Sequence, residues 1–155
     1  MKVIVAAVGK PRDAALAAAI REYEQRAAHY WPLETVEVKE EPARGGITPA
    51  LVMQREGERV SAKLPKSALL VLCDPRGEQY DSARFAEWLQ QVRERAQDVV
   101  FVIGGAFGIG EELRQGPHRR LTLAPWTLPH ELARLVLAEQ LYRAGTLLRG
   151  EPYHK

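Results

Sequence analysis

Short apolar runs alternate along the chain with segments in which apolar residues recur at helical spacing. The apolar runs predict strands over residues 2–8, 35–39, 68–73, 99–103 and 121–123. The helical spacing predicts helices over residues 13–29, 49 to about 63, 81 or 82 to about 96, and about 130 to 148, with a short helix after residue 110. Regular alternation of strand and helix is typical of α/β domains. We therefore expect a single α/β domain with a mainly parallel sheet and helices on both faces.

The predicted strands differ in where their polar residues stand. Residues 68–73 (ALLVLC) and 99–103 (VVFVI) are apolar throughout, as in strands that are buried on both faces. Residues 35–39 (TVEVK) alternate, which favours a place nearer the edge of the sheet. The sequence Asp74-Pro75-Arg76-Gly77 is expected to end the strand 68–73, and residues 40–47 are expected to form a loop. Ligands bind beyond the carboxyl ends of strands in open α/β sheets, so we expect a site at residues 73–74, 104–105 and 123–127.

Length and composition limit the class of protein. The 155 residues, of which 46% are hydrophobic and 27% charged, suit one folded domain. No apolar segment is long enough to cross a bilayer, and the apolar run near the N-terminus has the length of one strand. We therefore expect a cytoplasmic protein without a membrane partner. Cys73 is the single cysteine and the four histidines lack the spacing of a metal cluster, so we predict no metal site.

The charge is small overall and uneven along the chain. The net charge is +2, but residues 116–155 carry six Lys and Arg against three acidic residues. A mildly basic C-terminal segment is compatible with a phosphate-bearing partner. An ordinary solvated surface explains the same charges equally well.

Residues 104–110 (GGAFGIG), called the glycine-rich loop below, follow a predicted buried strand and precede a short helix. Glycine allows positive φ and lets a ligand approach the backbone closely. The order of the glycines does not match the dinucleotide fingerprint G-x-G-x-x-G, and Glu111 stands where a Walker A loop needs lysine. The loop is therefore either a tight turn without a ligand or a site for a small, largely uncharged adenosine ligand.

Residues 121–130 (LTLAPWTLPH) combine two prolines with apolar side chains. Pro125 and Pro129 keep this segment out of a helix interior. A rigid, irregular backbone walled by apolar side chains is typical of small-molecule pockets. Trp126 and Leu128 fit equally well as a latch that packs the last helix onto the sheet.

The predicted final helix, residues 130–148, is apolar around most of its circumference. Such a helix is buried more completely than the surface helix of a monomer, which favours a subunit interface. Glu139 and Arg143 are spaced to pair along this helix. The tail that follows, residues 149–155 (RGEPYHK), carries groups that can stack on a base and contact a phosphate. Most short C-terminal tails are merely frayed, which is the alternative here.

Six segments of the sequence, taken in order, resemble one protein family. The resemblance lies in VAAVGK, LLVLCDPRG, VFVIGGAFG, LTLAPWTLPH, RLVLAEQLYRA and GEPYHK, and it covers essentially the whole chain. These segments are similar to the ribosomal RNA large subunit methyltransferase H family, which are compact SPOUT (α/β-knot) methyltransferases. The resemblance implies a C-terminal trefoil knot, a homodimer and no DNA partner. It also implies methyl transfer from S-adenosylmethionine to N3 of a pseudouridine in helix 69 of 23S rRNA, within the assembled ribosome.

The resemblance further implies roles for individual residues. Those expected to contact S-adenosylmethionine are Leu72, Cys73, Gly104, Gly105, Leu123, Ala124, Pro125, Trp126, Thr127 and Leu128. Those expected near the RNA or in catalysis are Arg134, Tyr142, Arg143, Tyr153 and His154. The chain departs from the family at Cys73, where leucine is commoner, and at residues 124–126. Pro125 there removes one backbone N–H that could otherwise donate to the methyl donor.

Methyl transfer to N3 of a uracil ring requires that the N3 proton leaves. His154 is the acceptor that we favour, because an imidazole titrates near neutral pH. The alternatives are His130 and Glu139. Tyr153 is expected to stack on the base or orient it, and Arg134 and Arg143 are expected to hold phosphate or stabilise charge on the uracil carbonyls.

Two other functional classes stay open on the sequence alone. A ribosome-binding module without catalysis would keep the basic tail but would not bind S-adenosylmethionine. A nucleotide-dependent oxidoreductase fits the α/β pattern but lacks the required order of glycines.

Overall fold

Five strands form one sheet in the computed structural model, which describes residues 1–116 and 118–154. The strands are β1 (Val3–Val8), β2 (Leu33–Val38), β3 (Leu69–Gln79), β4 (Val99–Ile103) and β5 (Arg119–Thr122). They lie in the order β2-β1-β4-β3-β5, and every neighbouring pair is parallel. β4 is buried along its whole length, as predicted, and so is its neighbour β1. In β3, which the sequence predicts to be buried on both faces, residues 71 and 72 are buried but residues 69, 70 and 73 are partly exposed. β2 lies at an edge and is partly exposed, as predicted.

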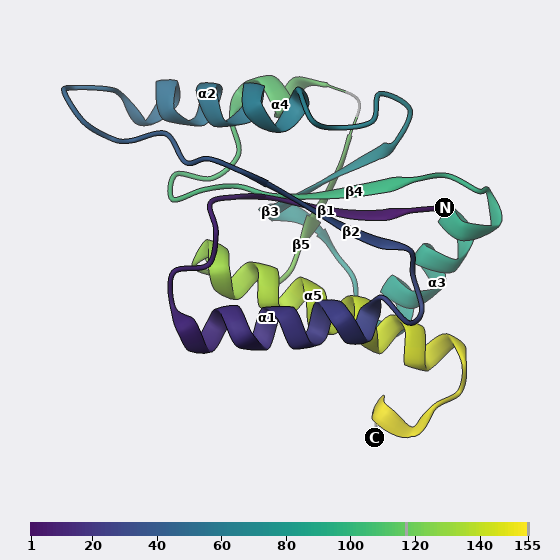
Figure 1. Ribbon diagram of the computed structural model, residues 1–155. Coiled ribbons are helices and arrows are strands. Elements are labelled where there is room, and N and C mark those ends of the chain that lie inside the picture. Colours follow the sequence, from purple (N-terminus) through teal and green to yellow (C-terminus); the bar gives the residue numbers. More distant parts are fainter. Residues whose placement is uncertain (117, 155) are drawn as a thin grey trace.

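Helices cover both faces of this sheet (Figure 1). On one face lie α2 (Pro49–Ser61) and α4 (Glu111–Gln115). On the other lie α1 (Ala14–Ala27), α3 (Ser82–Glu94) and α5 (His130–Leu148), which the short 3-10 helix η1 (Pro152–His154) follows. The predicted α/β domain with helices on both faces is confirmed.

Side-chain alternation along the strands divides the interior into two cores. Val5 and Phe101 face the core beneath α1, α3 and α5, together with Trp31 and Leu137. Their neighbours along the strands, such as Val102, face the core beneath α2. A strand that supplies both cores must be apolar at every position, which explains the uninterrupted apolar runs of β1 and β4.

Polar side chains fix where several helices begin. Thr48 accepts the N–H of Leu51 at 3.2 Å, and Pro49 occupies the first turn of α2, where its missing N–H costs nothing. Asp81 accepts the N–H of Arg84 at 2.8 Å at the start of α3. The predicted helix bounds agree with the observed ones to within a few residues.

β3 continues past the point where the sequence predicts its end. Both Cys73 and Glu78 pair with Leu121 of β5, so residues 74–77 bulge outward between them. The Asp74 carboxylate accepts the N–H of Arg76 at 2.9 Å, which fixes the turn inside the bulge. The predicted end of the strand at residues 74–77 is therefore wrong, because β5 offers pairing positions on both sides of the bulge.

Two kinds of feature are absent from residues 1–116 and 118–154. No helix in that part of the chain is long and apolar enough to cross a membrane. Nor does that part contain a group of three or more His, Cys, Asp and Glu side chains placed to hold a metal ion. The trefoil knot implied by the family resemblance stays a prediction.

Candidate functional site

A cavity of about 670 Å³, called the first cavity below, lies beyond the carboxyl end of β4. Three segments that are distant in sequence meet there: the bulge of β3, the glycine-rich loop, and the segment between β5 and α5. These are the segments where the parallel topology predicts a ligand site. The walls include Cys73, Asp74, Arg76, Gly104, Gly105, Arg114, Thr127, Leu128 and His130.

The glycine-rich loop packs closely against itself and against α2. A Cβ added to Gly104 would lie 2.5 Å from the carbonyl carbon of Gly108, which itself has a φ of +89°. A Cβ added to Gly105 would lie 2.7 Å from Oε2 of Glu56 on α2. Packing within the protein therefore accounts for glycine at 104 and 105, and backbone conformation accounts for it at 108.

Asp74 places a buried negative charge in the wall of the first cavity, since only 3% of the residue is exposed. Its carboxylate accepts the N–H and the Nε–H of Arg76, at 2.9 and 3.2 Å, and lies 3.3 Å from Nη2 of Arg114. Burial by itself opposes ionisation, but these donors and positive charges outweigh it and hold the pKa of Asp74 below its usual value. Nε of Arg114 is buried and has no hydrogen-bond partner among the described residues.

The residues expected to contact S-adenosylmethionine fall into three groups. Those in the wall of the first cavity are Cys73, Gly104, Gly105, Thr127 and Leu128. Those around a small side cavity of about 50 Å³ are Leu123, Ala124 and Trp126, together with Cys73 and Leu128. Leu72 is fully buried in the core, and Pro125 borders neither cavity. Loss of contact with water raises the pKa of the Cys73 thiol to about 12, so this part of the wall is uncharged at neutral pH.

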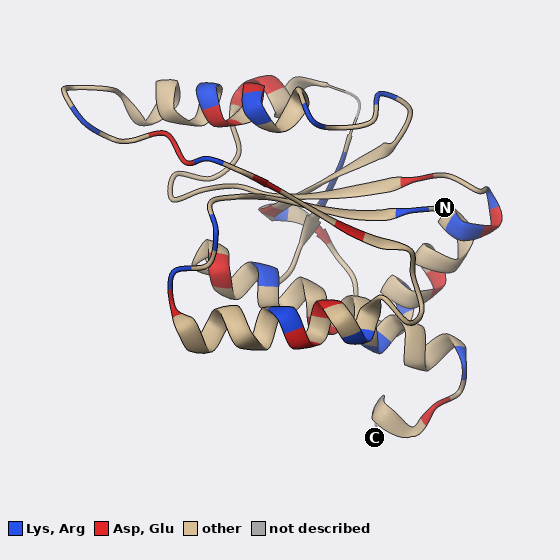
Figure 2. Cartoon of the chain, in the orientation of Figure 1, with Lys and Arg blue, Asp and Glu red and all other residues tan. Residues whose placement is uncertain are grey.

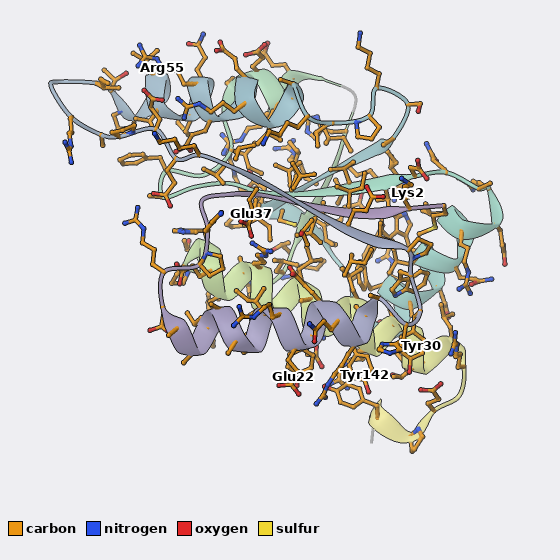
Figure 3. The ribbon with its side chains drawn as sticks, in the orientation of Figure 1. Lys2, Glu22, Tyr30, Glu37, Arg55 and Tyr142 are labelled. Carbon is orange, nitrogen blue, oxygen red and sulfur yellow. The ribbon has the colours of Figure 1, made fainter. Side chains whose placement is uncertain are left out.

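Arg134 lies in the interior of the protein, although the family resemblance implies a place near the RNA. Its residue is 5% exposed, and its guanidinium donates to both carboxylate oxygens of Glu24 on α1 and to Glu37 on β2. Glu37 lies on the edge strand β2 and is labelled in Figure 3. In this chain the guanidinium is therefore directed at two carboxylates, and its expected contact with RNA stays a prediction.

Tyr142, Arg143 and Tyr153 form a cluster around Glu139, called the tail cluster below. Arg143 Nη2 lies 2.6 Å from Oε1 of Glu139, which confirms the predicted pairing along the helix. The Tyr153 hydroxyl donates to the same oxygen at 3.1 Å, and its ring centroid lies 4.5 Å from that of Tyr142. Burial and hydrogen bonding raise the pKa of Tyr153 well above its usual value, so its hydroxyl keeps its proton. The side chain of His154 lies outside the part that the structure describes.

The aromatic rings of the tail cluster extend toward α1. Tyr30 and Tyr142 lie close together at the same end of α1 and α5, with ring centroids 5.8 Å apart (Figure 3). The Tyr30 hydroxyl donates to Glu151, and this hydrogen bond raises the pKa of Tyr30 to about 12. The tail is thereby held against α1 and α5.

The first cavity and the tail cluster lie at different ends of α5. His130 borders the cavity at the first residue of the helix, and Tyr142 comes twelve residues later. At about 1.5 Å per residue, these two positions are separated by roughly 18 Å along the helix axis, and Ala133, which also borders the cavity, lies roughly 9 Å from Glu139 at the centre of the cluster. One chain therefore brings the expected methyl-donor residues together but does not bring the expected RNA-binding residues to them.

The sequence pattern places Asp74 at the expected ligand edge of the sheet but gives its charge no role. It predicts Arg76 only as part of a strand end and does not single out Arg114. Their positions carried a usable signal, because Asp74 directly follows an apolar strand and Arg114 lies one turn into the helix after the glycine-rich loop. Polar residues at those points of an α/β domain face the ligand edge of the sheet.

Comparison with known proteins identifies the family of this chain. A family model described as a predicted SPOUT methyltransferase matches residues 1–154. The chain is 61% identical to the ribosomal RNA large subunit methyltransferase H of Gemmatimonas aurantiaca, and the match covers all of both chains. It is 44% identical to the protein of the same name from Anaeromyxobacter sp. strain K, again over both whole chains. It is 40% identical to that of Nitrosomonas eutropha, over all of this chain and 99% of the relative. The chain belongs to the SPOUT methyltransferase family.

Proposed function

We propose that this protein methylates N3 of a pseudouridine in helix 69 of 23S rRNA, using S-adenosylmethionine as the methyl donor. Full-length similarity to proteins named ribosomal RNA large subunit methyltransferase H supports the RNA substrate. The observation that carries the proposal is the first cavity, where the ends of β3 and β4 meet the segment after β5. We further propose that the substrate is the assembled ribosome, which places the enzyme in the cytoplasm.

The residues of the first cavity fit S-adenosylmethionine. A volume of about 670 Å³ lies in the range of small-molecule sites. Asp74 offers a negative charge to the sulfonium or the ammonium group, and the unpartnered Nε of Arg114 offers a donor to the carboxylate. Leu128 and the glycine-rich loop supply the apolar and backbone surface for the adenosine. We assign the residues at 72–73, 104–105 and 123–128 to this binding site.

S-adenosylmethionine supplies a methyl group that a nucleophile can attack in line with the sulfonium. The protein then has to align N3 with that methyl group and remove the N3 proton. We assign proton acceptance to His154, because histidine is a common general base in enzymes. Glu139 holds Arg143 and Tyr153 in fixed positions, so that Arg143 can stabilise negative charge on a uracil carbonyl while Tyr153 orients the base.

We propose that a homodimer completes the site, with the tail cluster of one subunit facing the first cavity of its partner. The separation of roughly 9 to 18 Å between the two groups along α5 supports this arrangement. So does Trp126, which is 78% exposed beside the side cavity. Large exposed aromatic residues are enriched where proteins bind partners.

Isothermal titration with S-adenosylmethionine, followed by methylation of ribosomes that lack the modification, tests the proposal. We expect saturable binding and transfer of labelled methyl to the large-subunit RNA. Binding to ribosomes without saturable binding of S-adenosylmethionine would leave a ribosome-binding module instead. A titration with NAD(H) in parallel addresses the oxidoreductase, for which we expect no binding.

A further inference from the structure

A second cavity, of about 810 Å³, lies on the other side of the glycine-rich loop. Ala106 and Phe107 of that loop border both cavities. The remaining walls come from α2, from the end of β2 and from the connections that follow β1 and β2, where basic and acidic segments are interspersed on the same side of the molecule (Figure 2). Apart from these two loop residues, none of the residues assigned above to methyl-donor binding or catalysis borders this second cavity.

The acidic residues in the wall of the second cavity are largely neutralised. Three of them form ion pairs: Glu37 with Arg134, Glu40 with Arg12, and Glu41 with Arg55 and Arg59. Lys10, Lys39 and Arg44 also border the cavity, are exposed, and form no ion pair with any of the described residues. The wall therefore presents three unneutralised positive charges, which suit phosphate groups.

The fourth acid, Glu56, supplies a different kind of group. It is only 4% exposed, and its Oε1 accepts the N–H of Glu41 at 3.1 Å. Its Oε2 is buried, lies against Gly105, and has no hydrogen-bond partner among the described residues. Burial raises the pKa of this carboxyl above its usual value. A buried oxygen without a partner is unfavourable, and a ligand with a hydrogen-bond donor can supply the missing partner.

Phe107 adds an aromatic surface at the rim that the two cavities share. It is 45% exposed, which is unusual for a large apolar side chain in this protein. An aromatic face beside several cations is the combination with which proteins bind unpaired nucleotides, because bases stack on the ring and phosphates contact the cations.

We propose that the second cavity binds a nucleotide of the RNA substrate that neighbours the methylated one. Its base lies on Phe107 and its phosphates contact Lys10, Lys39 and Arg44. A hydrogen-bond donor on that base points toward Oε2 of Glu56. The proposal rests on the proposed function, since an RNA strand that presents its target base to the first cavity passes over the shared rim at Phe107.

Two variants test this proposal through ribosome binding, measured over a range of salt concentrations with the target modification absent. In K10Q/R44Q, we expect the slope of log affinity against log salt to become shallower by about two, since two phosphate contacts are lost. In F107A, we expect affinity to fall by roughly fivefold or more through loss of base stacking. The control K66Q changes an exposed lysine in the connection before the amino end of β3, whereas the second cavity lies beyond the carboxyl ends of β1 and β2, so it should have no effect.

K10Q/R44Q is also titrated with S-adenosylmethionine, for which we expect an unchanged affinity, because neither Lys10 nor Arg44 borders the first cavity. If the unmodified protein binds both ligands and neither variant alters ribosome binding, the second cavity is not an RNA site and only this inference is overturned. If the unmodified protein binds neither S-adenosylmethionine nor ribosomes, the proposed function itself fails.

A separate titration with uridine and adenosine monophosphates examines free nucleotides. Saturable binding that the variants lose, with ribosome affinity intact, would assign the cavity to a free nucleotide and overturn the proposal. Dissociation of a dimer by F107A alone, measured by sedimentation, would assign the rim to a subunit interface and also overturn it.

Discussion

Arg134 on α5 and Glu24 on α1 form a buried two-point ion pair, with Nε 2.8 Å from Oε1 and Nη2 3.2 Å from Oε2. Glu37 on β2 accepts from the remaining Nη1 at 2.8 Å. The Arg134 side chain is 6% exposed, so these contacts replace water almost completely. A single guanidinium thereby joins two helices and the edge strand of the sheet.

Replacing Arg134 with alanine should lower the free energy of unfolding by about 3 kcal/mol, because two carboxylates lose a partner in a largely buried place. Urea denaturation at neutral pH measures this change. The control K2A breaks an ion pair with Glu34 in which both side chains are more than half exposed, and it should have little effect. Equal effects of the two variants would contradict the structural role of Arg134.

Gly145 allows α5 to approach Tyr30. A Cβ at this position would lie 2.2 Å from Cγ of the Tyr30 ring. We expect G145A to lower the free energy of unfolding by about 1–3 kcal/mol through overpacking. The matched control is G57A, also in a helix, where the added Cβ would lie 3.5 Å from Leu113 and the better helix propensity should raise stability by about 0.5–1 kcal/mol. If G145A were as stable as G57A, the close approach would not be real.

Asp74 should make the stability of the protein depend on acid pH. Its pKa is lower in the folded state than in an unfolded chain, where an aspartate titrates near about 3.9. The stabilisation is therefore present above that value and is lost as the pH falls through the lower, folded-state pKa. We expect D74N to be less stable than the original at pH 7 and to lose less stability on acidification. Unfolding by urea at a series of pH values measures both, and parallel pH profiles for the two proteins would rule out the linkage.

Deleting residues 153–155 should abolish methylation and leave the affinity for S-adenosylmethionine nearly unchanged. The reason is the separation of the tail cluster from the first cavity within one chain. Y153F provides a milder variant, which removes the hydroxyl that donates to Glu139 but keeps the ring on Tyr142. Isothermal titration and a methylation assay on ribosomes separate the two activities. If the affinity for S-adenosylmethionine were lost together with methylation, the assignment of the tail to RNA binding would be wrong.

Trp126 should contribute to the proposed dimer. Its side chain is largely exposed, and large aromatic side chains dominate the energetics of protein interfaces. We expect W126A to raise the dimer dissociation constant about tenfold or more, as measured by sedimentation equilibrium. Methylation should fall with the dimer population. An unchanged dimer would place Trp126 outside the interface.

The sequence predicted the layers of this fold because each strand carries its own burial pattern. β1 and β4 are apolar at every position and lie in the centre, and β2 alternates and lies at the edge. The same reasoning predicted the segments that border the first cavity, since the carboxyl ends of parallel strands meet at one edge. This reasoning did not predict the bulge at residues 74–77. The same turn-forming residues occur where a strand ends and where it is only interrupted by a bulge.

The sequence by itself determined the α/β alternation, the family resemblance, and the segments that border the first cavity. These depend on local periodicity and on motifs, which the order of residues contains directly. Only the tertiary structure decided that Arg134 is buried with Glu24 and Glu37, and that the tail cluster lies far along α5 from the cavity. It also revealed the second cavity, which three connections distant in sequence build together. Pairing, burial and cavities depend on which residues meet across the fold, and a linear pattern does not contain those distances.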